Sequence, residues 1–172
     1  MTMALKADRN ELDVDISFFY NEGTAEKGQV VVLDTVGSGA AMDQAQSKVK
    51  IAAATNALFP VGILLNDVVN LDLTRQHINW HKDEVQKGGK VAILKKGYVV
   101  TNKISGTPAA GVAAFVDDGT AGNIATDAEV TDGKKIMIGR FMSTKDADGY
   151  AKVEINLPMP IQNLDDDTVG LE

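Results

Sequence analysis

Three Asp-Gly pairs divide the last third of the chain into short runs. The pairs are Asp118-Gly119, Asp132-Gly133 and Asp148-Gly149. Glycine has no Cβ, so it tolerates the positive φ angles that tight turns between adjacent strands require. The runs are VAAFV before the first pair, KIMIGRFMS between the last two and YAKVEINL after the third. Short runs with such regular turn signals predict an antiparallel β-barrel or β-sandwich.

Strand-like runs also fill the first half of the chain. QVVVLD at 29–34 is rich in β-branched residues, and KVKIA at 48–52 alternates polar with apolar residues, as a half-buried strand does. VGILL at 61–65 is a third run, and its Gly62 predicts a bulge or a close backbone approach. The whole chain is therefore predicted to be all-β.

The stretch from Lys87 to Ile104 is predicted to form a central β-hairpin. Val91 and Ile93 lie in one apolar run, and Tyr98-Val99-Val100 forms the next. Lys95-Lys96-Gly97 lies between them as a short, polar, glycine-containing connector.

We expect a single domain, because 172 residues suit one core better than two. Residues 1–13 are polar and charge-mixed and are predicted to be an extended N-terminal arm. Residues 14–157 would form the small β-barrel or sandwich. Residues 158–172 carry prolines and the run Asp165-Asp166-Asp167, and are predicted to be a flexible acidic tail.

Charge and composition exclude several classes of function. The chain has 17 basic and 24 acidic residues, a formal net charge of −7 and no cysteine. It has no basic stripe for nucleic acid and no thiolate for a metal site. Its longest apolar run, Ala57–Leu65, is far shorter than a membrane helix and contains Pro60 and Gly62. We therefore expect no nucleic-acid partner and no membrane span.

No metal or cofactor is expected. His77 and His81 are four residues apart, but their segment has no helical pattern and no rigid ligand scaffold. Consecutive carboxylates at 165–167 do not converge easily on one ion, and Asp146-Ala147-Asp148-Gly149 lacks the later ligands of a calcium loop.

No catalytic set is expected either. None of Ser38, Ser47, Ser105 and Ser143 lies in the GxSxG setting of a nucleophile elbow. Gly37-Ser38-Gly39 is not followed by the Lys-Ser/Thr of a phosphate-binding loop. The sequence therefore predicts a protein that is not an enzyme.

Large aromatic residues supply the candidate contact site. Phe18, Phe19 and Tyr20 are consecutive, and Trp80 lies in a polar stretch. One interpretation makes the first three an ordinary core strand. The other makes all four residues a contact with another protein subunit, because interface cores are enriched in aromatic rings.

The order of the strand motifs resembles a known family. The motifs run KGQVVVLD, PVGILLNDV, HKDEVQKGGKVAILKKGYVVTN, AGVAAFVDDG and IMIGRFMSTKDADGYAKVEI. Their marker residues are Gly28, Pro60-Val61-Gly62-Ile63, Gly88-Gly89, Gly97-Tyr98-Val99-Val100 and Ile138-Gly139. Over residues 14–157 the chain resembles the small β-barrel head decoration, or cement, proteins of tailed bacteriophages.

The resemblance implies a structural role without catalysis. A decoration protein binds the outer surface of the major capsid protein lattice and stabilises the head. The resemblance further implies copies that meet one another, with a trimer favoured and a dimer as the alternative. It implies synthesis in the host cytoplasm and a final location on the outside of the virion.

Two other functions stay open at this point. One is a different phage structural barrel, from a tail or baseplate. The other is a bacterial small-molecule or carbohydrate-binding β-barrel. The low aromatic content of 5% counts against sugar binding, which usually needs stacked rings.

Overall fold

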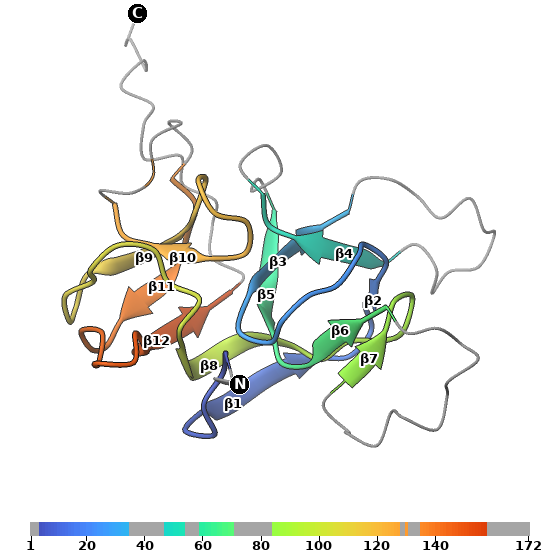
Figure 1. Ribbon diagram of the computed structural model, residues 1–172, viewed down its shortest axis with the longest axis horizontal. Coiled ribbons are helices and arrows are strands. Elements are labelled where there is room, and N and C mark those ends of the chain that lie inside the picture. The colour runs from blue at the N-terminus through green and yellow to red at the C-terminus, as the bar shows by residue number, and fades with distance from the viewer. Residues whose placement is uncertain are drawn as a thin grey trace, which may run out of the picture.

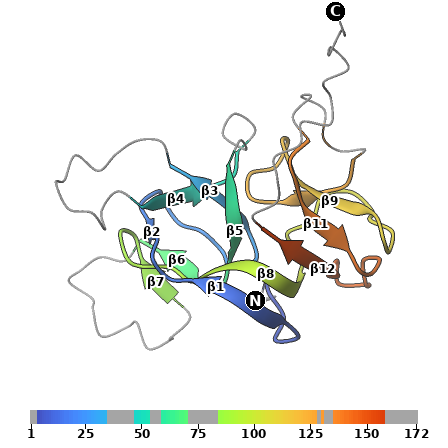
Figure 2. The same cartoon turned by 180° about the vertical axis from the view of Figure 1, so that it is seen from behind.

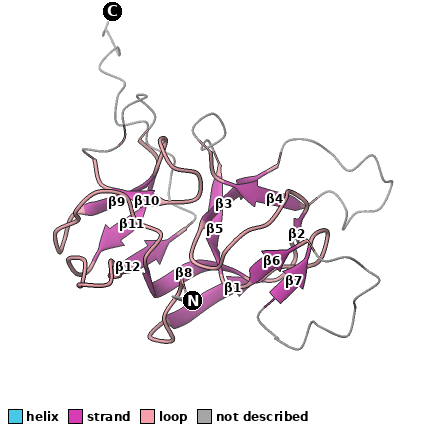
Figure 3. Cartoon of the chain, in the orientation of Figure 1, coloured by secondary structure: helices cyan, strands magenta, loops and turns pink. Residues whose placement is uncertain are grey.

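The protein is built of β-strands. The structure, a computed structural model, describes residues 4–34, 47–53, 59–70, 84–127, 130 and 135–157. Within these ranges every regular element is a strand (Figures 1 and 3), which confirms the predicted all-β class. No helix in the described part of the chain is long and apolar enough to cross a membrane.

The strands carry the labels of Figure 1. They are β1 (Asn10–Asp15), β2 (Phe19–Tyr20), β3 (Val30–Leu33), β4 (Lys48–Ile51), β5 (Pro60–Leu64), β6 (Asp67–Val69), β7 (Glu84–Gln86), β8 (Ile93–Thr101), β9 (Ala113–Val116), β10 (Ile124–Ala125), β11 (Met137–Phe141) and β12 (Ala151–Asn156).

One large sheet organises the chain. Its ten strands follow the order β10-β9-β11-β12-β8-β5-β3-β4-β2, with β1 paired to β8 beside this path. All its pairs are antiparallel except β2 with β4, and a separate sheet pairs β6 with β7 in parallel. The sheet is therefore dominated by antiparallel pairing, as predicted.

The sheet forks at β8. Residues Ile93–Tyr98 of β8 pair with β1, so β1 occupies one edge of that strand. On the other edge, Ile93 and Leu94 pair with β5, while Lys96–Thr101 pair with β12. Two groups of strands diverge from this edge, β2–β7 on one side and β9–β12 on the other (Figures 1 and 2). We call these groups the two lobes.

A register shift lets β8 serve both lobes. Leu94 and Val99 are five residues apart, so strict alternation would turn them to opposite faces of the strand. Both nevertheless belong to the same core cluster. Along β8, Lys95 has no partner on β1, because Asp13 pairs with Lys96 and Val14 with Leu94. This extra residue changes the face that β8 turns to the core.

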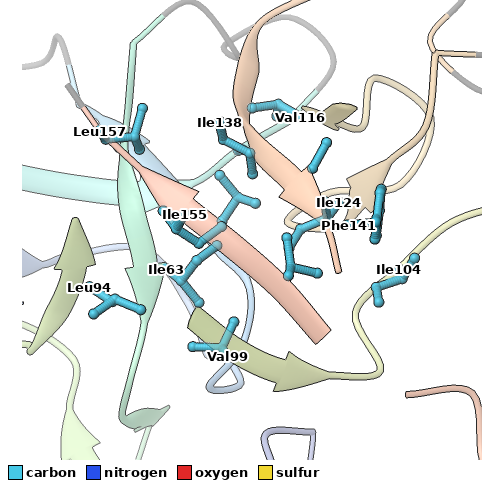
Figure 4. Packing of buried hydrophobic residues seen from close by; sticks show 14 of the residues in the cluster. Ile63, Leu94, Val99, Ile104, Val116, Ile124, Ile138, Phe141, Ile155 and Leu157 are labelled. Carbon is cyan, nitrogen blue, oxygen red and sulfur yellow. The ribbon is translucent and has the colours of Figure 1, made fainter. Parts of the chain in front are cut away.

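The main core lies between the two lobes. Val32 and Ile63 from one lobe share a cluster with Ile138 and Ile155 from the other. Figure 4 shows Ile63 from one group together with Ile138 and Ile155 from the other, and Leu94 and Val99 of β8 belong to the same cluster. A second cluster, which includes Val31 and Leu64, covers the opposite face of β3 and β5.

The predicted hairpin at 87–104 is wrong. Lys95-Lys96-Gly97 is not a connector, because β8 runs unbroken from Ile93 to Thr101. Gly97 has a φ of 141°, and a Cβ there would lie 1.9 Å from the Asn10 carbonyl oxygen. The close approach of β1 explains why residue 97 is a glycine. In the sequence, a glycine required for such an approach cannot be distinguished from a glycine required for a turn.

The other turn and bulge signals that fall on described residues are correct, and Asp132-Gly133 lies outside the described residues. Gly149 has a φ of 84° in the connection from β11 to β12, and Asp118-Gly119 lies in the connection from β9 to β10. Gly62 lies at a register shift between β3 and β5, and a Cβ there would be 2.2 Å from the Leu94 carbonyl oxygen.

Part of the segment expected to be an arm is built into the fold. Leu5 is 2% exposed and belongs to the main core cluster. Lys6 donates its backbone N–H to the Val100 carbonyl, and Thr101 donates its hydroxyl to the Ala4 carbonyl. Residues from Asn10 onward form β1. The charged residues that follow Leu5, which are Lys6, Asp8 and Arg9, conceal this role in the sequence.

Candidate docking surface

The predicted aromatic site is only partly exposed. Tyr20 is 1% exposed and lies in the second core cluster, and burial raises the pKa of its phenol. Phe18 and Phe19 are half-buried, with the ammonium groups of Lys95 and Lys90 each 5.5 Å from the respective ring centre. Trp80, with His77 and His81, lies outside the described residues. The structure thus brings Phe18–Tyr20 together but shows nothing about Trp80.

The most exposed large apolar side chains lie elsewhere, in and just after β1. Leu12 and Ile16 are each 65% exposed. Phe59, Met142 and Leu33 are the other large apolar side chains exposed in the described residues. Only Leu12 and Ile16 flank a strand edge that no other described strand occupies.

β1 has one free edge. Among the described strands it pairs only with β8, and it runs along the outside of the sheet (Figures 1 and 2). We call the side of Asn10–Asp15 that faces away from β8 the β1 edge. A strand edge presents backbone N–H and C=O groups that another extended chain can pair with.

A bulge presents Leu12 to solvent. Glu11 pairs with Gly97 and Asp13 with Lys96, so Leu12 is an extra residue with no partner on β8. Bulges re-aim side chains and are common at sheet edges. The bulge is formed where β1 passes over Gly97, the position at which a side chain would collide with Asn10.

An ion pair fixes the end of β1. Asp15 Oδ2 lies 2.5 Å from Lys95 Nζ, and Asp15 Oδ1 accepts hydrogen bonds from the backbone and the hydroxyl of Ser17. Partial burial would raise the pKa of Asp15, but the hydrogen bonds from Lys95 and Ser17 outweigh it and lower this pKa to about 2. The arrangement holds β1 against β8 where the chain turns toward Phe18.

Asp13 is different. No hydrogen bond or ion pair joins the side-chain carboxylate of Asp13 to another described residue. Its carboxylate is exposed, and its cross-strand neighbour is the exposed Lys96. The remaining carboxylate of the strand, Glu11, is bound by Arg9 at 2.5 Å. Asp13 is thus the acidic group of β1 that is open to a partner.

The neighbouring sheet face is polar and internally paired. Arg140, Glu154, Tyr98 and Asn10 form a row across β11, β12, β8 and β1. Arg140 bonds Glu154 at 2.5 Å, and Lys152 lies 3.8 Å from the centre of the Tyr98 ring. This face already satisfies its own charges, so it offers less to a partner than the β1 edge does.

The described residues contain no group of three or more potential metal ligands. Ser105 Oγ donates a hydrogen bond to the buried carboxylate of Asp117 and accepts one from Asn123. Asp117 also accepts the backbone N–H of Gly119, so these residues shape the connection between β9 and β10.

Sequence reasoning missed the β1 edge. The segment ELDVDI alternates acidic and apolar residues from Glu11 to Ile16, which is a strand signal. The many charges before it led to the interpretation of residues 1–13 as an arm. The predicted boundary after residue 13 falls inside β1, which runs from Asn10 to Asp15.

Comparison with known proteins gives one family. Residues 8–156 match a family model described as structural cement protein (E217 gp24/Pam3 gp6), a phage cement family. The match begins just before β1 and ends at the last residue of β12, so it spans every described strand. No curated protein matches the chain.

Proposed function

Because the chain belongs to the structural cement proteins of phages, we propose that it binds the outer surface of the major capsid protein lattice and stabilises the head. The single observation that carries this proposal is the family match across the complete set of described strands. The protein would lie over the seams between capsomers and resist the outward pressure of packaged DNA.

The physical chemistry of the chain agrees with such a role. A symmetric shell offers many equivalent sites, so the stabilisation of the head adds up even where each site binds weakly. The buried core spans both lobes, which gives the protein a rigid body that can bridge two neighbouring capsid subunits. The role requires no catalysis, and we propose that the protein is not an enzyme.

We further propose that copies of the protein meet on the shell, with a trimer favoured and a dimer as the alternative. Phe18, Phe19, Tyr20 and Trp80 are the candidate contact residues. Tyr20 is buried in the core cluster against which Phe18 packs, so the exposed parts of Phe18 and Phe19 would make the contact on this segment. If they form the contact, Phe19→Ala should weaken shell binding by about 2 kcal/mol while the fold stays intact. Wild-type occupancy for Phe19→Ala and Trp80→Ala would mean that the contact lies elsewhere.

Electron cryo-microscopy of virions that contain this chain tests the proposal. We expect density for the chain on the outer surface of the shell, repeated over the lattice. Heads that lack the protein should lose their DNA at a lower temperature than decorated heads. Density confined to the tail or baseplate would contradict the proposal, as would equal thermal stability of the two kinds of head.

A further inference from the structure

The β1 edge combines features that are rarely left together without a partner. It offers a strand edge that no other described strand occupies, together with the solvent-facing side chains of Leu12 and Ile16. Exposed edges are usually protected by charges or bulges that prevent pairing. Here the bulge does the opposite for Leu12, because it turns this side chain outward rather than burying it.

Charge decides which kind of strand fits this edge. Three carboxylates, Glu11, Asp13 and Asp15, lie within five residues of β1. A two-fold axis perpendicular to the sheet would pair β1 with β1 of a second copy in an antiparallel register. Any such register that overlaps the middle of the strand sets carboxylates opposite carboxylates, and like charges directly opposite are destabilising. A second copy is therefore a poor occupant.

A basic strand is a better occupant. Arg9 and Lys95 already bind Glu11 and Asp15, which leaves Asp13 as the acidic group that can receive a charge from outside. A lysine or arginine on an incoming strand would pair with Asp13 while an apolar residue beside it covers Leu12. Cross-strand pairs of this kind are what fix the register of a two-stranded contact.

We propose that the β1 edge docks an extended segment of the capsid protein, which adds a strand beside β1 and sets a lysine or arginine opposite Asp13. This inference rests on the proposed function, because it takes the capsid lattice as the partner. Backbone pairing supplies the geometry of the contact, and Leu12, Ile16 and Asp13 supply its specificity.

Binding to heads stripped of the protein tests the inference. Asp13→Lys and Leu12→Ala should each weaken binding about tenfold, because each removes one central contact. Asp127→Lys is the charge control: it makes the same charge change on an exposed residue after β10, in the lobe away from β1. It should bind like the wild type. Because Asp127 is paired with Lys135 at 3.0 Å, the thermal unfolding of this variant is measured as well. Unchanged thermal unfolding of the two β1 variants would show that they keep the fold.

Hydrogen exchange gives an independent readout. Amides of residues 10–16 should exchange more slowly in protein bound to heads than in free protein at the same concentration. If the wild type binds heads but these amides exchange as in the free protein, and Asp13→Lys binds normally, the β1 edge is not the docking surface and the proposed function stands. If the wild type does not bind heads, both proposals fail.

A second copy on the β1 edge would give a different result. Protection of residues 10–16 would then appear in the protein alone as its concentration rises, together with a dimer in sedimentation. That outcome would overturn the inference and assign the edge to self-association.

Discussion

At the scale of single residues, Gly97 connects the shape of β1 to the shape of the sheet. It combines a φ of 141° with a backbone contact that leaves no room for a Cβ. Either condition alone favours glycine. Together they explain why this position is a glycine although β8 continues through Lys95-Lys96-Gly97 without a turn.

Gly97→Ala is expected to destabilise the protein by about 3 kcal/mol, since it adds a steric clash to backbone strain. Urea unfolding measures the loss. Gly149→Ala is the control, because Gly149 has a φ of 84° but open space around its missing Cβ, so it carries the strain alone and should cost about 1 kcal/mol. Equal losses for the two variants would mean that the contact with Asn10 does not constrain β1.

The ion pair of Asp15 with Lys95 predicts a loss of stability in acid. The pKa of Asp15 is about 2 in the folded protein, against 3.8 for an ordinary aspartate. A lowered carboxyl pKa stabilises the fold above the unfolded value, and this stability is lost as the pH falls from about 4 through about 2. Its size is about 2 kcal/mol.

Unfolding experiments across this pH range check the expectation. Asp15→Asn should be less stable than the wild type at pH 7, and the difference should shrink as the pH approaches 2. Lys95→Met should remove much of the same dependence, because Lys95 holds the charged carboxylate. A difference that stays constant from pH 7 to pH 2 would contradict the assignment.

At the scale of elements, the N-terminal residues 4–15 belong to the sheet and its core. Leu5 fills the main core and is joined to β8 through its neighbours Ala4 and Lys6. Deleting residues 1–13 would remove this core residue along with most of β1. Loss of shell binding after such a deletion would therefore report unfolding as well as lost contacts.

Comparing Leu5→Ala with Leu12→Ala separates the loss of folding stability from the loss of contacts with the shell. Leu5→Ala should cost about 3 kcal/mol of stability, as expected for a buried leucine. Leu12→Ala should change stability by less than about 0.5 kcal/mol, because Leu12 is exposed. Thermal or urea unfolding of both variants checks this. A large loss for Leu12→Ala would show that the β1 bulge is needed for the fold itself.

Much of the element order was predictable from the sequence, for reasons that are local. QVVVLD, KVKIA and VGILL carry their own strand pattern, and β3, β4 and β5 form there. Asp148-Gly149 needs only its own φ to make a turn. The errors concern properties that depend on distant partners. Gly97 was interpreted as a turn because its reason for being glycine is Asn10, far away in sequence.

The candidate docking surface was less predictable than the fold. The aromatic run at 18–20 drew attention because interfaces favour such rings, yet Tyr20 is buried in the core. Leu12 is exposed because of a bulge that depends on the register between β1 and β8. A register between strands so far apart in the chain leaves no trace in the composition of either one.

At the scale of the whole molecule, the shared core should join the two lobes into one cooperative unit. Val32 and Ile63 pack in the same cluster as Ile138 and Ile155, so neither lobe can open without exposing apolar surface of the other. Native-state hydrogen exchange measures this. The slowest amides of β3 and of β11 should share one opening free energy.

A clear difference between those two free energies would mean that the lobes unfold separately. The control is β10, a two-residue strand at the end of the sheet. Its amides should open more easily than those of β3 and β11, because strands at the end of a sheet fray locally.

The fork at β8 also bears on how the chain comes to be folded during synthesis. Gly97 pairs with Glu11, made 86 residues earlier (97 minus 11), and with Ile155, made 58 residues later (155 minus 97). Pairings between such distant residues make folding slow, in the range of milliseconds to seconds. While β12 is still inside the ribosome, the part of β8 from Lys96 to Thr101 has no neighbour on that edge. A nascent chain therefore carries an open strand edge until its last strand emerges, and it is a natural client for a chaperone during that interval.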